Sequence, residues 1–85
     1  MTEKQRRITT ELQSPYMFGQ VIQQSRLQQR LSQRDVAGML GISQKWVWEM
    51  EQGKPGIFLD RLFKMLKATG ITLYAEFELK DGTET

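Results

Sequence analysis

The sequence contains no cysteine and no histidine. Their absence excludes disulfide bonds, thiolate nucleophiles, imidazole bases and the usual zinc sites together. Asp and Glu side chains remain, but none of them falls in the spacing of a loop that binds a hard metal ion. We therefore expect no catalytic residue, no metal site and no cofactor, and we do not expect an enzyme.

Long apolar runs are also absent. No stretch approaches the roughly 20 apolar residues that a membrane-spanning helix needs, and residues 1–10 lack the apolar core of a signal peptide. The 85-residue chain is 39% hydrophobic and 26% charged, which is typical of one small globular domain. These features predict a cytoplasmic protein without a membrane partner. Because so small a domain buries little apolar surface, dimerisation would supplement its stability.

Positive charge is distributed unevenly, although the net charge is only +2. Residues 1–57 hold eight Lys and Arg against five Asp and Glu, whereas residues 58–85 hold four against five. The positive excess therefore lies in the first two thirds of the chain, where a polyanion would bind.

Hydrophobic periodicity predicts a mainly α domain of four or five helices over residues 14–70. Four helices are located, over 15–29, 33–40, 44–52 and 58–69, and the first three follow the N-cap residues Ser14, Ser32 and Ser43. Alternating apolar and polar residues predict one C-terminal strand over 71–79. Residues 1–13 are predicted to be a flexible arm and residues 80–85 a polar tail.

The most informative segment runs from Leu31 to Gly53, where two short helices flank the turn Gly41-Ile42-Ser43. Ala37 is expected where the helices cross, since a small side chain lets them approach. Gly41 supplies the left-handed backbone angle that larger residues resist. This pattern predicts a helix-turn-helix motif, whose second helix enters the major groove of DNA.

The same segment resembles the helix-turn-helix of phage-repressor-like, or Xre-family, regulators, from about Phe18 to Ile71. The likeness rests on Leu-Ser-Gln before the second helix, Val-Ala within it, and Gly-Ile-Ser-Gln leading into Glu51-Gln-Gly-Lys-Pro. The Ser14-Pro15 entry and the C-terminal strand add a narrower resemblance to HipB antitoxins. That resemblance implies a nucleoid-associated repressor of its own promoter, a homodimer, and a HipA-type kinase toxin as partner. Residues 80–85 depart from it, because they hold no aromatic anchor.

The second helix of the motif carries the side chains expected to read bases. Gln44 and Lys45 stand at its N-terminal end, where glutamine pairs with adenine and lysine reaches guanine. One turn later, Trp48 either contacts a thymine methyl group or is a partly exposed apolar residue. The helix is not basic, so phosphate contacts must come from residues around it. The residues expected to meet DNA are Gln33, Arg34, Ser43, Gln44, Lys45, Trp48, Glu49 and Lys54.

The resemblance also assigns structural roles. It implies that Gln33 holds a phosphate and braces the recognition helix, and that Arg26 and Glu51 form an ion pair between the first and third helices. Trp46 is expected to pack beside the second helix.

The strand over 71–79 has no other predicted strand to bond. Its simplest neighbour is its own copy across a two-fold axis, and the alternative is a strand folded back on its own domain. The expected dimerisation residues are Leu73, Tyr74, Ala75, Phe77 and Leu79, with Leu73, Ala75 and Phe77 toward the helices. A two-fold dimer places two recognition helices about one DNA turn apart, which predicts an inverted-repeat operator.

Two other functions fit the same sequence. A phage-type or chromosomal repressor would need no toxin. A protein-interaction module would retain the fold without binding DNA, and the recognition helix with little positive charge favours this alternative.

Overall fold

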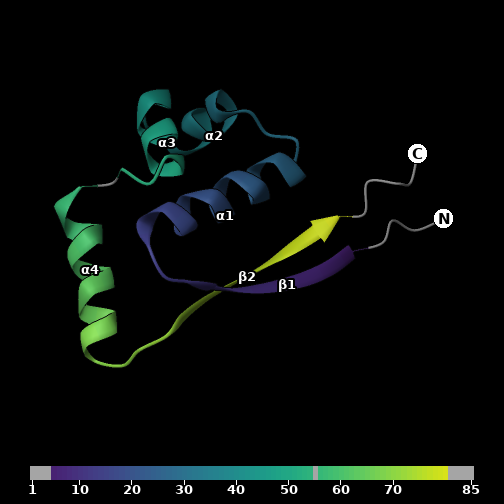
Figure 1. Cartoon of the computed structure of the whole chain (residues 1–85). Helices are drawn as coiled ribbons and strands as arrows, with labels where there is room; N and C mark the ends of the chain where they lie inside the picture. The colour runs from purple at the N-terminus through teal and green to yellow at the C-terminus, as the bar shows by residue number, and fades with distance from the viewer. Residues whose placement is uncertain (1–4, 55, 81–85) are drawn as a thin grey trace.

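The structure is a computed structural model that describes residues 5–54 and 56–80. Within them the chain forms strand β1 (Gln5–Leu12), helices α1 (Pro15–Gln28), α2 (Gln33–Leu40), α3 (Gln44–Glu51) and α4 (Ile57–Ala68), and strand β2 (Leu73–Lys80) (Figure 1). The predicted mainly helical fold is confirmed, with four helices in the described part of the chain. Helix α2 has the predicted bounds, and no end of the other three differs from the predicted one by more than one residue.

The first three helices begin at capping serines. Ser14 and Ser43 each accept a hydrogen bond from the backbone N–H three residues later, at 3.2 and 3.0 Å. Ser32 forms a capping box with Asp35, in which the Ser32 N–H donates to the Asp35 carboxylate at 2.8 Å and the Asp35 N–H donates to Ser32 Oγ at 2.9 Å. These bonds satisfy N–H groups that a helix start leaves unpaired.

Strand β1 lies where we predicted a flexible arm over 1–13, so that prediction is wrong for residues 5–12; residues 1–4 lie outside the described residues. β1 pairs antiparallel with β2, from Gln5 opposite Lys80 to Leu12 opposite Leu73. The predicted single strand is therefore one half of a two-stranded sheet, and its neighbour comes from its own chain. β1 was missed because Ile8 and Leu12 are its only strongly apolar residues, which makes its alternation weak.

One face of the sheet packs toward α1. On this face Ile8 lies opposite Phe77 and Leu12 opposite Leu73, and all four side chains are buried or half-buried. The predicted inward orientation of this side of β2 is confirmed. In Figure 1, α1 lies between the sheet below it and the α2–α3 pair above it.

The opposite face of the sheet is exposed. Tyr74 is 61% exposed, and Arg7 lies 3.8 Å from Glu76 across the strands, both with exposed side chains. Tyr74 therefore points outward, as predicted.

The backbone of Leu79, another predicted dimerisation residue, lies opposite Arg6. Its side chain lies outside the described residues.

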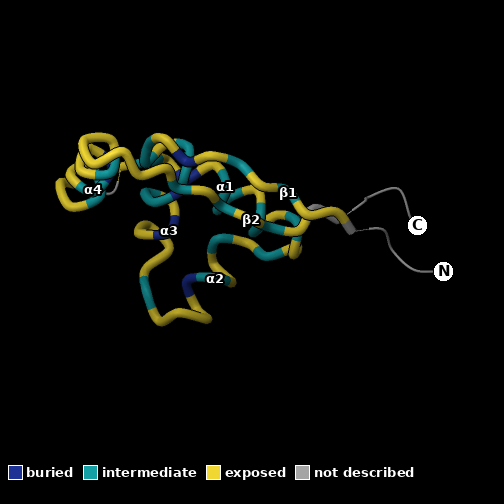
Figure 2. The backbone as a smooth tube through the Cα atoms, turned by 90° about the horizontal axis from the view of Figure 1, so that it is seen from below, coloured by how far each residue is buried: buried dark blue, intermediate teal, exposed yellow. Residues whose placement is uncertain are grey.

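Helix α4 buries one face and exposes the other. Phe63 is buried, and its ring meets Phe18 of α1 edge to face with 6.4 Å between the centroids. Ile57, Phe58 and Met65 are 66%, 79% and 67% exposed. Figure 2 shows α4 as largely exposed at one end of the molecule. This apolar face has no cover within the described part of the chain.

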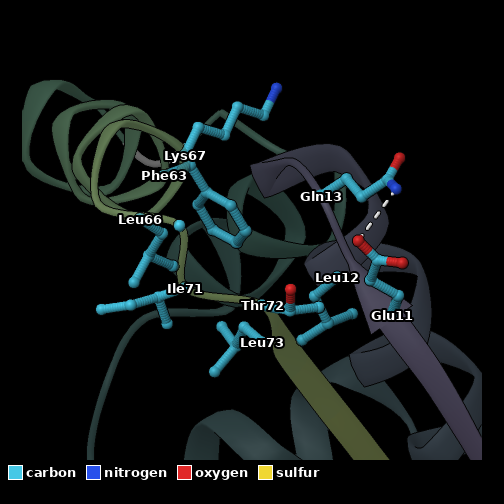
Figure 3. A pocket seen from close by; sticks show the side chains of 10 residues that line it. Glu11, Leu12, Gln13, Phe63, Leu66, Lys67, Ile71, Thr72 and Leu73 are labelled. Carbon is cyan, nitrogen blue, oxygen red and sulfur yellow. Dashed lines mark hydrogen bonds between the residues drawn. The ribbon is translucent and has the colours of Figure 1, made fainter.

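The core is small. Among the described residues the buried apolar side chains are Leu12, Ala37, Val47 and Phe63. Beside Leu12 and Phe63, a cavity of about 430 Å³ separates the end of α4 from the adjoining ends of β1 and β2 (Figure 3). Most of the residues that line this cavity are exposed, so it opens to solvent at the junction of α4 and the sheet.

Candidate nucleic-acid interface

Helices α2 and α3 meet through a tight turn. Gly41 ends α2 with φ +69°, and the next backbone N–H, of Ile42, donates to the carbonyl of Ala37 at 3.0 Å. Ala37 and Val47 are 6% and 4% exposed. The turn thus has the helix-turn-helix geometry that its sequence predicted.

A glycine inside α1 lets α3 pack against it at close range. A Cβ atom built on Gly19 would lie 2.5 Å from the carbonyl oxygen of Met50 and 2.6 Å from that of Glu51. Only glycine fits there without moving the backbone. We did not predict this contact, although an isolated glycine within a helical pattern is a signal for close packing.

An ion pair fastens the same end of α3. Arg26 of α1 donates to both carboxylate oxygens of Glu51, from Nε at 2.6 Å and from Nη2 at 3.0 Å, and its Nη1 donates to the carbonyl of Leu31 at 2.8 Å. The Glu51 side chain is fully buried, and that of Arg26 is 9% exposed. The structure therefore brings together the two residues that the resemblance paired.

Gln33 joins this pair from the start of α2. Its Nε2 donates to Glu51 Oε1 at 3.0 Å, so one carboxylate ties α1 and α2 to α3. Burial alone would raise the pKa of Glu51, but the hydrogen bonds from Arg26 and Gln33 and the Arg26 charge outweigh it and lower that pKa. The hydrogen bond that Arg26 donates to Glu51 in turn raises the pKa of Arg26. Gln33 thus braces α3, and its other amide hydrogen and carbonyl oxygen have no bond within this network.

The N-terminal turn of α3 is exposed. Ser43, Gln44 and Lys45 are exposed, Trp48 is 44% exposed, and Glu49 is half-buried. A hollow of about 340 Å³ is lined by Gln33, Gln44, Lys45 and Trp48. The predicted base-reading residues therefore share one surface with Gln33.

Positive charge flanks this surface. Lys54 is exposed and its Nζ lies 6.0 Å from the centroid of the Trp48 ring, a cation–π distance. Arg34 and Arg30 are also exposed. Phosphate-binding cations are thus available around a helix that has few of its own.

Trp46 differs from our prediction that it packs beside α2. It is 49% exposed and lines a small cavity with Glu49, Met50 and Lys54. No hydrophobic period distinguishes Trp46 from Trp48 in the sequence.

The predicted dimerisation residues lie on the sheet, apart from the α3 surface. Leu73, Ala75 and Phe77 are half-buried on the face toward α1, so their own chain already covers part of them. Within the described residues the sheet has two strands, and each strand has one unpaired edge. These edges are where a further strand would bond.

A family model described as a helix-turn-helix domain matches residues 17–74, which is more than half of the chain. The chain belongs to this helix-turn-helix family. Comparisons with curated proteins and with solved structures gave no match. The helix-turn-helix domain is the unit of a DNA-binding regulator, with the second helix as its reading element. In this chain the second helix of the motif is α3.

Two other kinds of feature are absent from the part of the chain that the structure describes. No helix there is both long and apolar enough to cross a membrane. No group of three or more acidic side chains in the same residues is placed to hold a metal ion.

Proposed function

We propose that this helix-turn-helix protein is a sequence-specific transcriptional repressor that binds an inverted-repeat operator as a homodimer. The observation that carries this proposal is the contrast within α3. Its C-terminal end is fixed by Gly19, Arg26 and Gln33, while Gln44 and Lys45 are exposed at its N-terminal end. A rigidly held helix that presents polar side chains at one end suits base recognition.

In the proposed complex, DNA affinity and sequence specificity come from different residues. Gln44 and Lys45 contact base edges, and Trp48, Glu49 and Ser43 lie beside them on α3. Phosphates are bound by the exposed cations Arg34 and Lys54 and by the free groups of Gln33. Salt should therefore weaken binding to all DNA sequences alike.

A second copy would pair along the unpaired edge of β2. The result is a four-stranded sheet with β2 of each copy at its centre. A two-fold axis normal to that sheet puts both sets of helices on one side of it. Since α1 separates the sheet from α2 and α3 (Figure 1), both recognition helices would then face the same DNA.

Charge disfavours some registers of this pairing. Facing residues of antiparallel strands share one face of the sheet, and like charges opposite each other are unfavourable. Centring the axis on Ala75 sets Tyr74 opposite Glu76 of the second copy and Leu73 opposite its Phe77. An axis at Phe77 would instead set Glu76 opposite Glu78. We therefore propose the Ala75-centred register.

A HipB-type antitoxin that also binds a HipA-type kinase toxin is the second candidate. The apolar face of α4, with Phe58 79% exposed and Met65 67% exposed, favours a protein partner. Co-purification of a kinase-like protein with this chain would support the antitoxin. A repressor without a toxin is expected if the chain alone accounts for repression of its promoter.

The DNA-binding proposal is tested by titrating the protein against DNA from upstream of its own gene at two salt concentrations. Gln44→Ala combined with Lys45→Ala should lower affinity roughly tenfold or more, because each lost base contact costs about 1–3 kcal/mol. Lys67→Ala removes one positive charge from an exposed site on α4 and should change affinity little. No binding by the unaltered protein at low salt would leave the interaction-module alternative.

A further inference from the structure

Trp48 forms the aromatic wall of the hollow on the α3 surface. The other lining residues, Gln33, Gln44 and Lys45, are polar. Trp48 is 44% exposed, and it lies one helical turn after Gln44, on the same side of α3. An apolar group that enters this hollow would therefore meet the indole ring and be bordered by hydrogen-bonding side chains.

Two contacts hold the side chains that form the walls of the hollow. Gln33 gives one amide hydrogen to Glu51 at 3.0 Å, which holds its side chain at the wall. Lys54 Nζ lies 6.0 Å from the Trp48 ring centroid, and its charge on the ring favours one placement of the indole. Both walls are thus held before any ligand arrives, which reduces the ordering cost of binding.

We propose that this hollow binds the 5-methyl group of a pyrimidine in the major groove, and that Trp48 determines specificity by contacting it. This inference rests on the proposed DNA-binding function. The methyl group of thymine is the apolar group that the floor of the major groove presents, and 5-methylcytosine carries the same group. An indole offers it apolar contact, with one N–H donor and no acceptor.

The rise of the α-helix also predicts how far the methyl contact of Trp48 lies along the DNA from the adenine contact of Gln44. Four residues of helix advance about 6 Å, which is close to two base-pair steps. We therefore expect a methylated pyrimidine within about two base pairs of the adenine that Gln44 reads, once in each half-site.

The experiment begins with DNA sites selected from random oligonucleotides by the unaltered protein. Each thymine of the selected site is then replaced by deoxyuridine, which removes the methyl group and keeps every hydrogen-bonding group. One position in each half-site should lose affinity about fourfold, since burial of one such carbon is worth about 0.8 kcal/mol. At that position, 5-methylcytosine should bind better than cytosine by a similar factor if the methyl alone is recognised.

The tryptophan variants assign the effect to a side chain. Trp48→Ala should bind uracil and thymine sites equally at that position, and Trp48→Phe should retain part of the preference. Trp46→Ala is the matched control, because Trp46 is similarly exposed at 49% but lines a different cavity. It should keep the full preference.

The outcomes of this experiment distinguish a failure of methyl recognition from a failure of the DNA-binding proposal. If no sequence is selected, the DNA-binding proposal fails. If a sequence is selected but no thymine in it is sensitive to deoxyuridine, the inference is overturned and DNA binding stands. A preference that persists in Trp48→Ala overturns the role of Trp48 in the same way.

Discussion

The two halves of the molecule are held together by different means. Helices α1 to α3 are joined by a buried polar network and a close backbone contact at Gly19. The sheet and α4 rely on apolar side chains, of which Leu12 and Phe63 are buried and the others half-buried, and α4 exposes Phe58 to 79%. The half made of α1 to α3, which is the proposed reading half, is thus complete within one chain, whereas the half made of the sheet and α4 leaves strand edges and apolar surface exposed. This difference suits a regulator that must hold a rigid helix at DNA and join a second copy elsewhere.

The largest expected effect lies in the network of the reading half. Glu51→Ala should lower the free energy of unfolding by about 3–5 kcal/mol, because it leaves the Arg26 charge buried and unpaired. Arg7→Ala is the control in the sheet half, where the pair with Glu76 is 3.8 Å apart and its side chains are 64% and 58% exposed. Arg7→Ala should lower the free energy of unfolding by under about 1 kcal/mol.

Urea unfolding of both variants measures this difference. If Glu51→Ala yields no folded protein, Glu51→Gln supplies a weaker disruption of the same network, because the amide keeps the shape of the side chain and an oxygen that accepts hydrogen bonds. Equal, small losses from Glu51→Ala and Arg7→Ala would contradict the contrast between the halves.

A smaller effect is expected from the close contact of α1 and α3. Gly19→Ala should cost about 1–3 kcal/mol, because the added carbon would overlap backbone oxygen of α3. Gly38 of α2 has nothing within 4 Å of its built Cβ atom, so Gly38→Ala should stabilise by about 0.5–1 kcal/mol. Thermal unfolding of the pair tests this, and losses of the same size in both would contradict it.

Lowering the pH should gradually reduce the stability of the half made of α1 to α3. The folded-state pKa of Glu51 is lowered, so its ion pair stabilises the fold fully above the ordinary glutamate pKa of about 4.3 and loses that effect as the pH falls through the lowered value. A hydrogen bond from the Ser32 backbone lowers the pKa of Asp35 in the same direction.

The measurement is the free energy of unfolding between pH 7 and pH 3. Glu51→Gln should show a smaller decrease than the unaltered protein, and adding Asp35→Asn should reduce the decrease further. An unchanged pH profile in Glu51→Gln would contradict the assignment.

The prediction with the smallest expected effect on stability concerns strands β1 and β2. Since the chain has no cysteine, Ala75→Cys introduces a single thiol at the proposed axis and should form a disulfide-linked dimer under mild oxidation. Thr9→Cys, exposed on β1, should stay monomeric on a non-reducing gel. Cross-linking through Thr9→Cys alone would place the axis at β1 instead. Phe77→Asp is a poorer test, because Phe77 also packs within its own chain.

The helix-turn-helix could be predicted because its signals are local. Ser32 and Ser43 cap helices through bonds that span three residues, and Gly41 ends α2 with its own backbone angle. Each signal lies within one turn of the feature that it specifies. The positions of Gln44 and Lys45 follow from that motif.

The sheet could not be predicted in the same way. β1 bonds to a strand at the other end of the chain, and its inner face mixes Ile8 and Leu12 with Thr10. Neither residue pattern nor spacing relates two segments so far apart. The hollow beside Trp48 likewise depends on Gln33 and α3 being brought together in space.

Hydroxyl-radical footprinting on DNA from upstream of the gene tests the central claim most directly. A homodimer that reads DNA with α3 should protect two stretches related by two-fold symmetry, with centres about 10–10.5 base pairs apart. Gln44→Ala combined with Lys45→Ala should remove both together. A single protected stretch, or protection that survives this double substitution, would contradict the account.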